Sequence, residues 1–252
     1  MPNLGLHIGF ALEAKKRLRH PVLDEHQGSF LLGCTSPDVR LFAGWQRERT
    51  HFFKLATDPA GAGIEGMLRA NPHLEKSERL SRETVAFLLG YMSHLNCDET
   101  WICDVYRRFF GKGSPMEHDP LVHVLDRALQ FELDRRERES IKDLEGALKT
   151  IEGAWAGVDV GFIDKPLLQE WQGVVIKRSG RDMPWERFRG FVSRIHPKAT
   201  DGEVEWIIGN IPALLEKVRE HINDDEVQAF RESAIQAFLT SAERYLHEGQ
   251  IS

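Results

Sequence analysis

The chain has 252 residues, 41% of them hydrophobic, and carries a formal net charge of -6 at neutral pH. This length is enough for a sizeable core in one domain or in two small ones. The sequence has no basic stripe and no lysine- and arginine-rich tract, which argues against binding of nucleic-acid duplexes by charge.

The cysteines and the N-terminal charge pattern indicate a reducing, cytoplasmic compartment. Cys34, Cys97 and Cys103 form no C-x-x-C pair, so the sequence favours neither a disulfide framework nor a thiolate zinc site. The apolar part of residues 1–20 precedes the charges, which is the wrong order for a signal peptide. No apolar segment reaches the roughly 20 residues that a transmembrane helix needs. We therefore expect a cytoplasmic protein.

The chain is predicted to begin with two helices. Residues 4–18 have apolar side chains at helical spacing and charges late in the segment, and His7 lies in the apolar part. Pro21 ends or interrupts this helix. The polar residues 24–29 can cap a second, short helix over residues 30–34.

Turns and loops follow. Pro37 directly precedes Asp38, and a Ser-Pro step of this kind favours a turn, in which an aspartate is usually a cap. His51 comes shortly afterwards, in front of two phenylalanines. Residues 58–63 contain glycine and proline and are predicted to form a loop.

The next predicted helix carries the most informative residues. It opens at residues 81–84, continues through the apolar run of residues 85–92, and reaches His94 and Asp98. Glycines and a proline then break the chain before a further predicted helix over residues 121–136.

The rest of the sequence indicates helices throughout. Their predicted ranges are residues 137–154, 162–177, 184–195, 203–221 and 224–247, with Asp201-Gly202 and Asp224-Asp225 as plausible N-terminal caps. No segment has the alternating pattern of a strand. The sequence therefore predicts an all-α fold in a single domain, residues 1–252. Residues 1–130 carry the candidate site, and residues 131–252 add helices of unassigned role.

His94 and Asp98 are four residues apart, so a helix places both side chains on one face, about one turn from each other. An imidazole nitrogen and a carboxylate oxygen at this separation can bind one divalent metal ion. The alternative is a buried histidine with a carboxylate as its hydrogen-bond partner, and for this pair in isolation the alternative is favoured.

Other residues of the first half extend the pair to a set of metal-ligand types. The candidate ligands are His7, Asp38, His51, His94, Asp98 and His118. Zinc and other divalent cations are held by such imidazoles and carboxylates, and catalytic zinc has three protein ligands and an open position for water. A single histidine on an apolar helix face is more often structural.

The order of these residues resembles the zinc-dependent phospholipase C family, which is related to the S1/P1 nuclease fold. The resemblance covers roughly residues 1–130. It rests on an N-terminal helical histidine, a Pro-Asp turn, a His-Phe pair and a Gly-Tyr-x-x-His-x-x-x-Asp segment on a buried helix. In this chain these are His7, Pro37-Asp38, His51-Phe52 and residues 90–98.

The resemblance implies a multi-helix phospholipase C/P1 nuclease-like bundle with one to three zinc ions, or another divalent metal. By position, a first ion would be held by Asp38, His51, His94 and Asp98. Asp98 would also bridge to another ion shared with His7, and His118 matches a later histidine of the family.

The sequence departs from the family pattern in three places. Val122 stands where the family has a glutamate ligand, and Asp104 stands near the position of a further histidine ligand. His123 points about 100° away from Val122 on a helix, although it forms a different pair with Asp119. Secreted members ligate zinc with a processed N-terminal residue. Here that ligand is expected to be missing or supplied differently.

The implied activity is a phosphodiesterase of the phospholipase C type, in which a metal-activated water attacks the phosphorus of a phosphodiester or phospholipid-like substrate. Asp38 would be the catalytic residue, either as a ligand or as the base that takes the proton. One of Arg40, Arg47 and Arg49 would bind a substrate phosphate, and for each a solvated surface position is the more frequent alternative.

Two other functions stay open. The first is a non-catalytic, metal-binding helical scaffold, which Val122 favours. The second is another all-α metal-dependent phosphohydrolase acting on nucleotides, such as an HD-type enzyme. Against it, the adjacent pair His118-Asp119 precedes Pro120 and has no helical partners of the expected kind. Two or three ions per chain would favour the hydrolase, and one would favour the scaffold.

Overall fold

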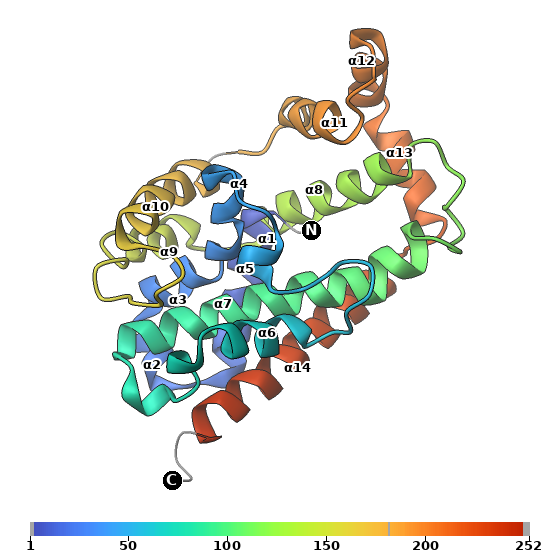
Figure 1. Cartoon of the computed structure of the whole chain (residues 1–252). Coiled ribbons are helices and arrows are strands. Elements are labelled where there is room, and N and C mark those ends of the chain that lie inside the picture. The colour runs from blue at the N-terminus through green and yellow to red at the C-terminus, as the bar shows by residue number, and fades with distance from the viewer. Residues whose placement is uncertain (1–2, 181, 249–252) are drawn as a thin grey trace.

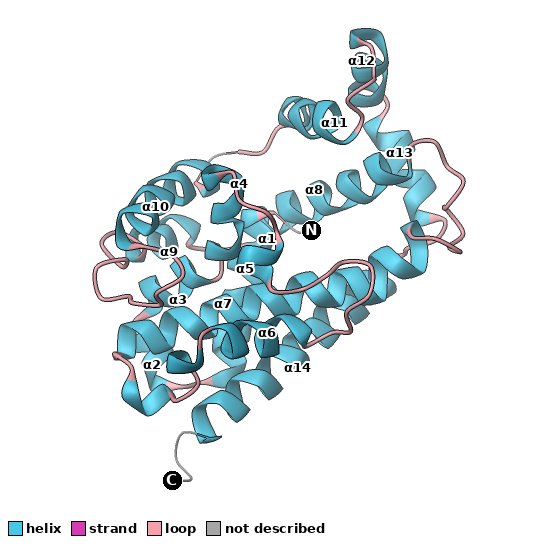
Figure 2. Cartoon of the chain, in the orientation of Figure 1, coloured by secondary structure: helices cyan, strands magenta, loops and turns pink. Residues whose placement is uncertain are grey.

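The computed structural model describes residues 3–180 and 182–248, and over these ranges it contains helices and no strand (Figure 2). The all-α prediction is confirmed. The elements of the first part are α1 (Leu4–Leu18), α2 (Pro21–Glu25), α3 (Gln27–Gly33), η1 (Ser36–Asp38), α4 (Val39–Ala43), α5 (Glu48–His51), α6 (Ala62–Ala70), η2 (Pro72–Leu74), η3 (Ser77–Arg79), α7 (Arg82–Thr100) and the π-helix η4 (Trp101–Phe110). Those of the second part are α8 (Val122–Ser140), α9 (Leu144–Thr150), α10 (Lys165–Ser179), η5 (Trp185–Phe188), α11 (Arg189–Ile195), α12 (Asp201–Gly209), α13 (Ile211–Arg219) and α14 (Asp224–Glu248).

Helix α7 is the axis of the molecule. The hydroxyl of Ser81 accepts a hydrogen bond from the backbone N–H of Thr84 and so caps its first turn. From Thr84 to Thr100 every residue of α7 is buried, because α3, α14 and α1 all pack against it. Figure 1 shows α7 crossing the middle of the molecule with α14 running alongside. A helix that is covered on all sides can carry its polar side chains into an interior site.

Helix α1 is held against α8 by a buried charge pair. The carboxylate of Asp134 accepts a hydrogen bond from the backbone N–H of Leu6 at 2.9 Å, and Arg138 Nε donates to its other oxygen at 2.7 Å. Leu6 lies in the first turn of α1, where a helix has backbone N–H groups without partners and favours negative charge. This contact holds the first turn of α1 against α8 at Leu6, the residue before His7.

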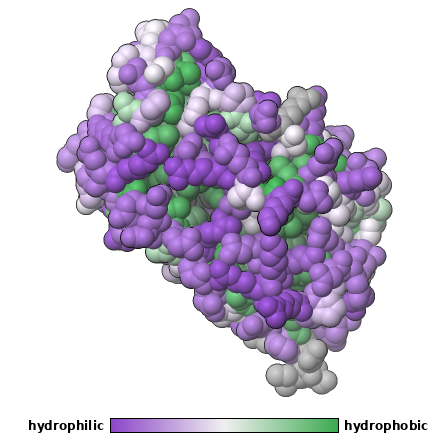
Figure 3. Space-filling view, turned by 180° about the vertical axis from the view of Figure 1, so that it is seen from behind, coloured by the Kyte–Doolittle hydropathy of each residue, from purple (hydrophilic) through white to green (hydrophobic). Residues whose placement is uncertain are grey.

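The second part of the chain completes the same core. Buried side chains of α8, α10 and α14 belong to one hydrophobic cluster with those of α1, α3 and α7. Helices α11 and α12 project from this body (Figure 1). Hydrophilic side chains cover most of the rear face, with apolar patches between them (Figure 3). Among the described helices, none is long and apolar enough to cross a membrane.

Several predicted boundaries are wrong. The predicted helix 137–154 is divided, because α8 runs on to Ser140 and α9 spans only Leu144–Thr150. The predicted helix 203–221 is two helices, α12 and α13, that meet at Asn210, and Pro212 stands in the first turn of the second. The caps lie one residue earlier than predicted: Thr200 forms a capping box with Glu203, and the Asn223 side chain accepts from the Glu226 N–H.

Candidate metal centre

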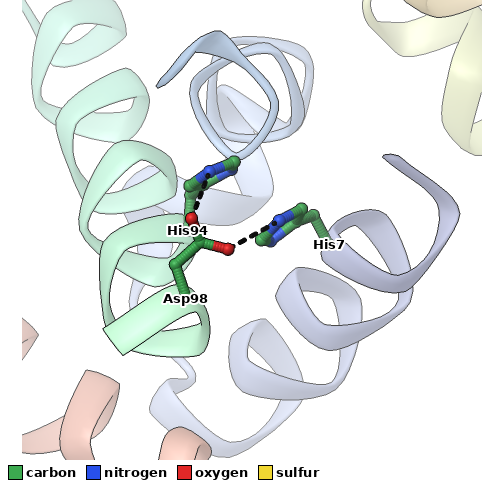
Figure 4. A group of neighbouring side chains, drawn as sticks. All are labelled: His7, His94 and Asp98. Carbon is green, nitrogen blue, oxygen red and sulfur yellow. Dashed lines mark ion pairs between the residues drawn. The ribbon is translucent and has the colours of Figure 1, made fainter. Parts of the chain in front are cut away.

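Five of the six predicted metal ligands meet at one buried point. His7 comes from α1, Asp38 from η1, His51 from α5, and His94 and Asp98 from α7. The histidines and Asp98 are at most 1% exposed, and Asp38 is 7% exposed. In Figure 4 the carboxylate of Asp98 lies beside the rings of His94 and His7, within ion-pair distance of both. Asp38 is therefore the member of the set nearest to solvent.

The Asp98 carboxylate is at the centre of the set. Its Oδ1 lies 3.5 Å from His7 Nε2, and its Oδ2 lies 3.2 Å from His51 Nε2 and 3.7 Å from His94 Nε2. Asp38 Oδ1 is 3.9 Å from His51 Nε2. Two groups of three could each hold an ion, His7-His94-Asp98 and Asp38-His51-His94. Within each group the three ligand atoms lie within 4.8 Å of one another.

Two of the imidazole rings are oriented by hydrogen bonds at their outer nitrogens. His94 Nδ1 is 2.8 Å from the Cys34 carbonyl oxygen, which can only accept, so this nitrogen carries the proton. His51 Nδ1 is 3.1 Å from the hydroxyl of Thr50, and that hydroxyl donates to the Arg47 carbonyl. In the neutral rings the Nε2 lone pairs of His51 and His94 then face each other across 3.3 Å. An outer hydrogen bond of this kind fixes the tautomer of metal-binding histidines.

Several polar atoms of the cluster have no hydrogen bond. Among the described residues these include both ring nitrogens of His7, Asp38 Oδ1 and Asp98 Oδ1, all of them buried. A buried polar atom without a partner costs about 1–3 kcal/mol. Three imidazoles and two carboxylates are donors that a divalent ion such as zinc prefers. The residues present therefore fit a metal ion.

The charges of the cluster also favour a cation. Burial opposes ionisation of Asp98, but His94, His51 and His7 hold its pKa well below the usual range. Burial lowers the pKa of His51 to about 4 and also lowers that of His7, so both rings are neutral at pH 7. Burial acts against protonation of His94 too, yet the carboxylate of Asp98, with Asp38 and the Cys34 carbonyl, raises its pKa. In the metal-free protein His94 is thus the ring that takes up a proton.

Close helix packing places these rings. A Cβ on Gly33 would lie 2.0 Å from the Phe87 carbonyl oxygen, and one on Gly90 would lie 1.9 Å from that of Phe30. Only glycine allows α3 and α7 to approach so closely, and this approach brings the Cys34 carbonyl to His94. From α7 the buried Tyr91 hydroxyl also donates to the Thr50 carbonyl, next to His51.

Arg47 lies inside the site, although a solvated surface position was the more frequent expectation for it. Its side chain is buried, and Nη2 donates to Asp98 Oδ2 at 3.1 Å while Nη1 donates to the Phe53 carbonyl at 3.1 Å. Arg49, two residues later, is exposed and stacks on Trp45. Arg40 is half-buried, and its Nε is without a hydrogen bond among the described residues. No local signal separates Arg47 from Arg49, because its partner Asp98 is distant in the chain.

The structure does not bring His118 to the cluster. His118 is exposed in the turn before α8 and belongs to neither donor group. Asp104 accepts from Ser233 Oγ at 3.2 Å, and His123 is exposed with its ring against Tyr106. Asp119, the partner of His118 in the pair considered for an HD-type enzyme, forms an ion pair with Lys217.

Comparison with known proteins gives one match. A family model described as zinc-dependent phospholipase C matches residues 4–155, which include all five clustered residues and extend beyond the range expected from the motifs. Neither the curated proteins nor the solved structures gave a match.

Proposed function

Since the chain belongs to the zinc-dependent phospholipase C family, we propose that it is a metal-dependent phosphoric diester hydrolase whose centre is the cluster around Asp98. The observation that carries the proposal is the meeting of three imidazoles and two carboxylates with buried, unpartnered atoms at one point. The hydrogen bonds among the described residues leave both nitrogens of His7 and one oxygen each of Asp38 and Asp98 unsatisfied, whereas a divalent ion would accept such donors.

The proposed roles of the side chains follow from their positions. One ion would be held by three of the five clustered side chains, either His7, His94 and Asp98 or Asp38, His51 and His94. A bound divalent ion supplies a lowered pKa for water and positive charge for the phosphoryl oxygens. Asp38 is the most exposed of the five, and its Oδ1 has no hydrogen bond among the described residues. It is therefore placed to be a ligand or to accept the proton of the attacking water.

Arg40 is the proposed phosphate contact. It follows Asp38 by two residues. Burial lowers the pKa of its guanidinium, which also interacts electrostatically with Asp38, Arg47, Asp98 and Arg127. Arginine binds phosphate oxygens through its planar set of N–H groups. The next two residues, Leu41 and Phe42, are 56% and 49% exposed. Apolar side chains beside a phosphate contact support a phospholipid-like substrate.

The test is metal content together with activity. Protein purified without chelator is assayed for zinc and for hydrolysis of a phosphocholine diester, a phosphatidylcholine vesicle and a nucleoside phosphodiester. We expect His94→Ala to lose the metal and the activity, and Asp38→Asn to lower kcat by about 10²-fold or more. His118→Ala is the matched control and keeps both. Equal activity of His94→Ala and the parent would refute the proposal.

A non-catalytic metal site is the second candidate, and the depth of the donors favours it. Four of the five are at most 1% exposed, so a substrate can approach from the Asp38 side alone. A protein that binds zinc tightly but hydrolyses none of the three substrate classes would support this candidate. Asp38→Asn would then change neither turnover nor phosphate binding.

A cytoplasmic location stays part of the proposal. All three cysteines are free thiols, and Cys34 and Cys97 are buried inside the core. Burial as thiols, without a disulfide, is in keeping with a reducing compartment. Fractionation of the cells that express the protein would test this, and recovery in a secreted fraction would contradict it.

A further inference from the structure

The two donor groups of the centre share one nitrogen. His94 belongs to both, and its Nδ1 is taken by the Cys34 carbonyl at 2.8 Å, which leaves Nε2 as its single metal-binding atom. A neutral imidazole nitrogen has one lone pair and binds one ion at a time. The two groups therefore cannot each hold an ion through His94. An ion bound to one group leaves the other with two donors, fewer than the three protein ligands of a catalytic zinc site.

The position beside Asp98 that a second cation would need is occupied by a side chain. Arg47 donates from Nη2 to Asp98 Oδ2 at 3.1 Å, and the Arg47 side chain is only 9% exposed in this pair. Its Nη1 is held by the Phe53 carbonyl at 3.1 Å, so the guanidinium is fixed from both sides. A charged and permanently protonated group at this point repels a second metal ion.

The charge balance of the interior points the same way. Asp38 and Asp98 are the two carboxylates of the donor set, and Arg47 already offsets one of them. Glu99, the next residue after Asp98, is turned away and accepts hydrogen bonds from the backbone N–H groups of Gly61 and Gly63. A second divalent ion would add two buried positive charges with no further carboxylate to balance them, which is costly.

The other histidines and carboxylates that could bind a second ion have different partners or lie on the surface. Asp126 is buried on α8, but its Oδ1 accepts from Trp101 Nε1 at 3.0 Å and from Gln130 Nε2 at 2.7 Å. His118 and His123 are exposed, and Asp104 bonds Ser233. Among the described residues, the histidines and carboxylates outside the five are in neither donor group.

We infer that the centre is built for one metal ion and that the buried guanidinium of Arg47 is the second positive charge at Asp98. The inference rests on the proposed function only for the identity of the ion. Arg47 is a positioning residue in this arrangement: it orients the Asp98 carboxylate by its hydrogen bond to Oδ2, and it leaves Oδ1 to the ion.

The test is a count of bound ions. Chelator-treated full-length protein is titrated with Co²⁺, and bound metal is counted by elemental analysis while the electron paramagnetic resonance spectrum reports coupling between ions. We expect one equivalent per chain and an uncoupled high-spin signal. Two or more tightly bound equivalents, or a coupled pair of ions, would overturn the inference. This measurement needs no variant.

Substitutions then test Arg47. We expect Arg47→Ala, which removes the internal charge, to take up a second Co²⁺ equivalent at higher concentration, and Arg47→Lys to stay at one. Arg49→Ala is the matched control, because Arg49 is exposed in α5, the helix that Arg47 immediately precedes. His118→Ala keeps the single ion. A folded Arg47→Ala protein that stays at one equivalent would overturn the role of Arg47, and loss of the ion from His118→Ala would overturn the donor set.

The result is separable from that of the activity test. One Co²⁺ equivalent in a protein that hydrolyses none of the phosphodiesters would uphold the single-ion centre and refute the hydrolase. Two equivalents in an active enzyme would do the reverse. A single ion is compatible with hydrolysis, since catalytic zinc sites need only three protein ligands and an open position.

Discussion

Replacing Gly90 by alanine tests whether the packing of α3 on α7 sets the geometry of the metal centre. A Cβ at this position would lie 1.9 Å from the Phe30 carbonyl oxygen and 2.8 Å from the backbone nitrogen of Cys34. Both atoms belong to the backbone, so no side-chain rotation relieves the contact. The helices have to separate by about 1.5 Å, from 1.9 Å to the 3.4 Å of an ordinary contact.

The expected loss of folding stability in Gly90→Ala is the sum of one stabilising effect and two destabilising effects. Alanine is favoured over glycine in a helix by about 1 kcal/mol. Overpacking of a dense core costs about 1–3 kcal/mol, and separation of the helices breaks the 2.8 Å hydrogen bond from His94 to Cys34, worth about 1 kcal/mol. We expect a net loss of about 2 kcal/mol. Metal affinity falls by tenfold or more, because ligand distances tolerate only about 0.2 Å.

The assay is chemical unfolding of the metal-free protein combined with a zinc titration. Gly173→Ala is the matched control, because Gly173 lies inside α10 and a Cβ there would meet no atom within 4 Å. That variant is expected to gain up to about 1 kcal/mol and to bind zinc as the parent does. If Gly90→Ala matches the parent in both stability and zinc affinity, close helix packing does not position His94.

Three further predictions concern pH and the start of α1. A proton competes with the ion for His94 Nε2, and Asp98 raises the pKa of His94 against the effect of burial. We therefore expect zinc affinity to fall as the pH drops through that pKa. Calorimetry in buffers of different ionisation enthalpy will detect the released proton, and pH-independent binding would contradict the assignment. Burial raises the pKa of Glu99 from 4.5 to about 7, so the folded state holds this proton more tightly than the unfolded state. The metal-free protein then loses up to about 3 kcal/mol of stability as the pH rises from about 4.5 through about 7, and the loss is complete above that pH. We expect Glu99→Gln to lack this loss in urea unfolding at about pH 5 and pH 8, and an identical pH dependence in both proteins would refute it. Asp134→Ala leaves Arg138 and the Leu6 N–H without their carboxylate and is expected to cost about 3 kcal/mol and to weaken zinc binding through His7; unchanged unfolding would show that the pair does not fix α1.

The parts of the site that follow from local spacing could be predicted. The four-residue interval between His94 and Asp98 holds because α7 is a regular helix there, capped by Ser81 as its sequence indicates. The Pro37-Asp38 step does form a short helical turn, η1, with Asp38 buried at its end. In these cases the signal and its structural consequence lie within a few residues.

The parts that depend on distant partners could not be predicted. Arg47 and Arg49 have the same local sequence character, but Arg47 alone meets Asp98, and no periodicity reveals a contact between two chain segments so far apart. The same limit applies to His118, whose exposure depends on how the turn before α8 lies on the body. A histidine in the right order along the chain is not thereby near the others.

The energetics of the cluster link its packing to its proposed chemistry. The unpartnered atoms of His7, Asp38 and Asp98 each cost the metal-free fold about 1–3 kcal/mol. They stay in place because glycine contacts between α3 and α7, and the Asp134 contact at the start of α1, hold the helices that carry them. Arg47 reduces this cost at one oxygen of Asp98 without closing the centre. An ion that enters therefore meets donors already oriented, and its binding relieves the cost of these buried polar atoms.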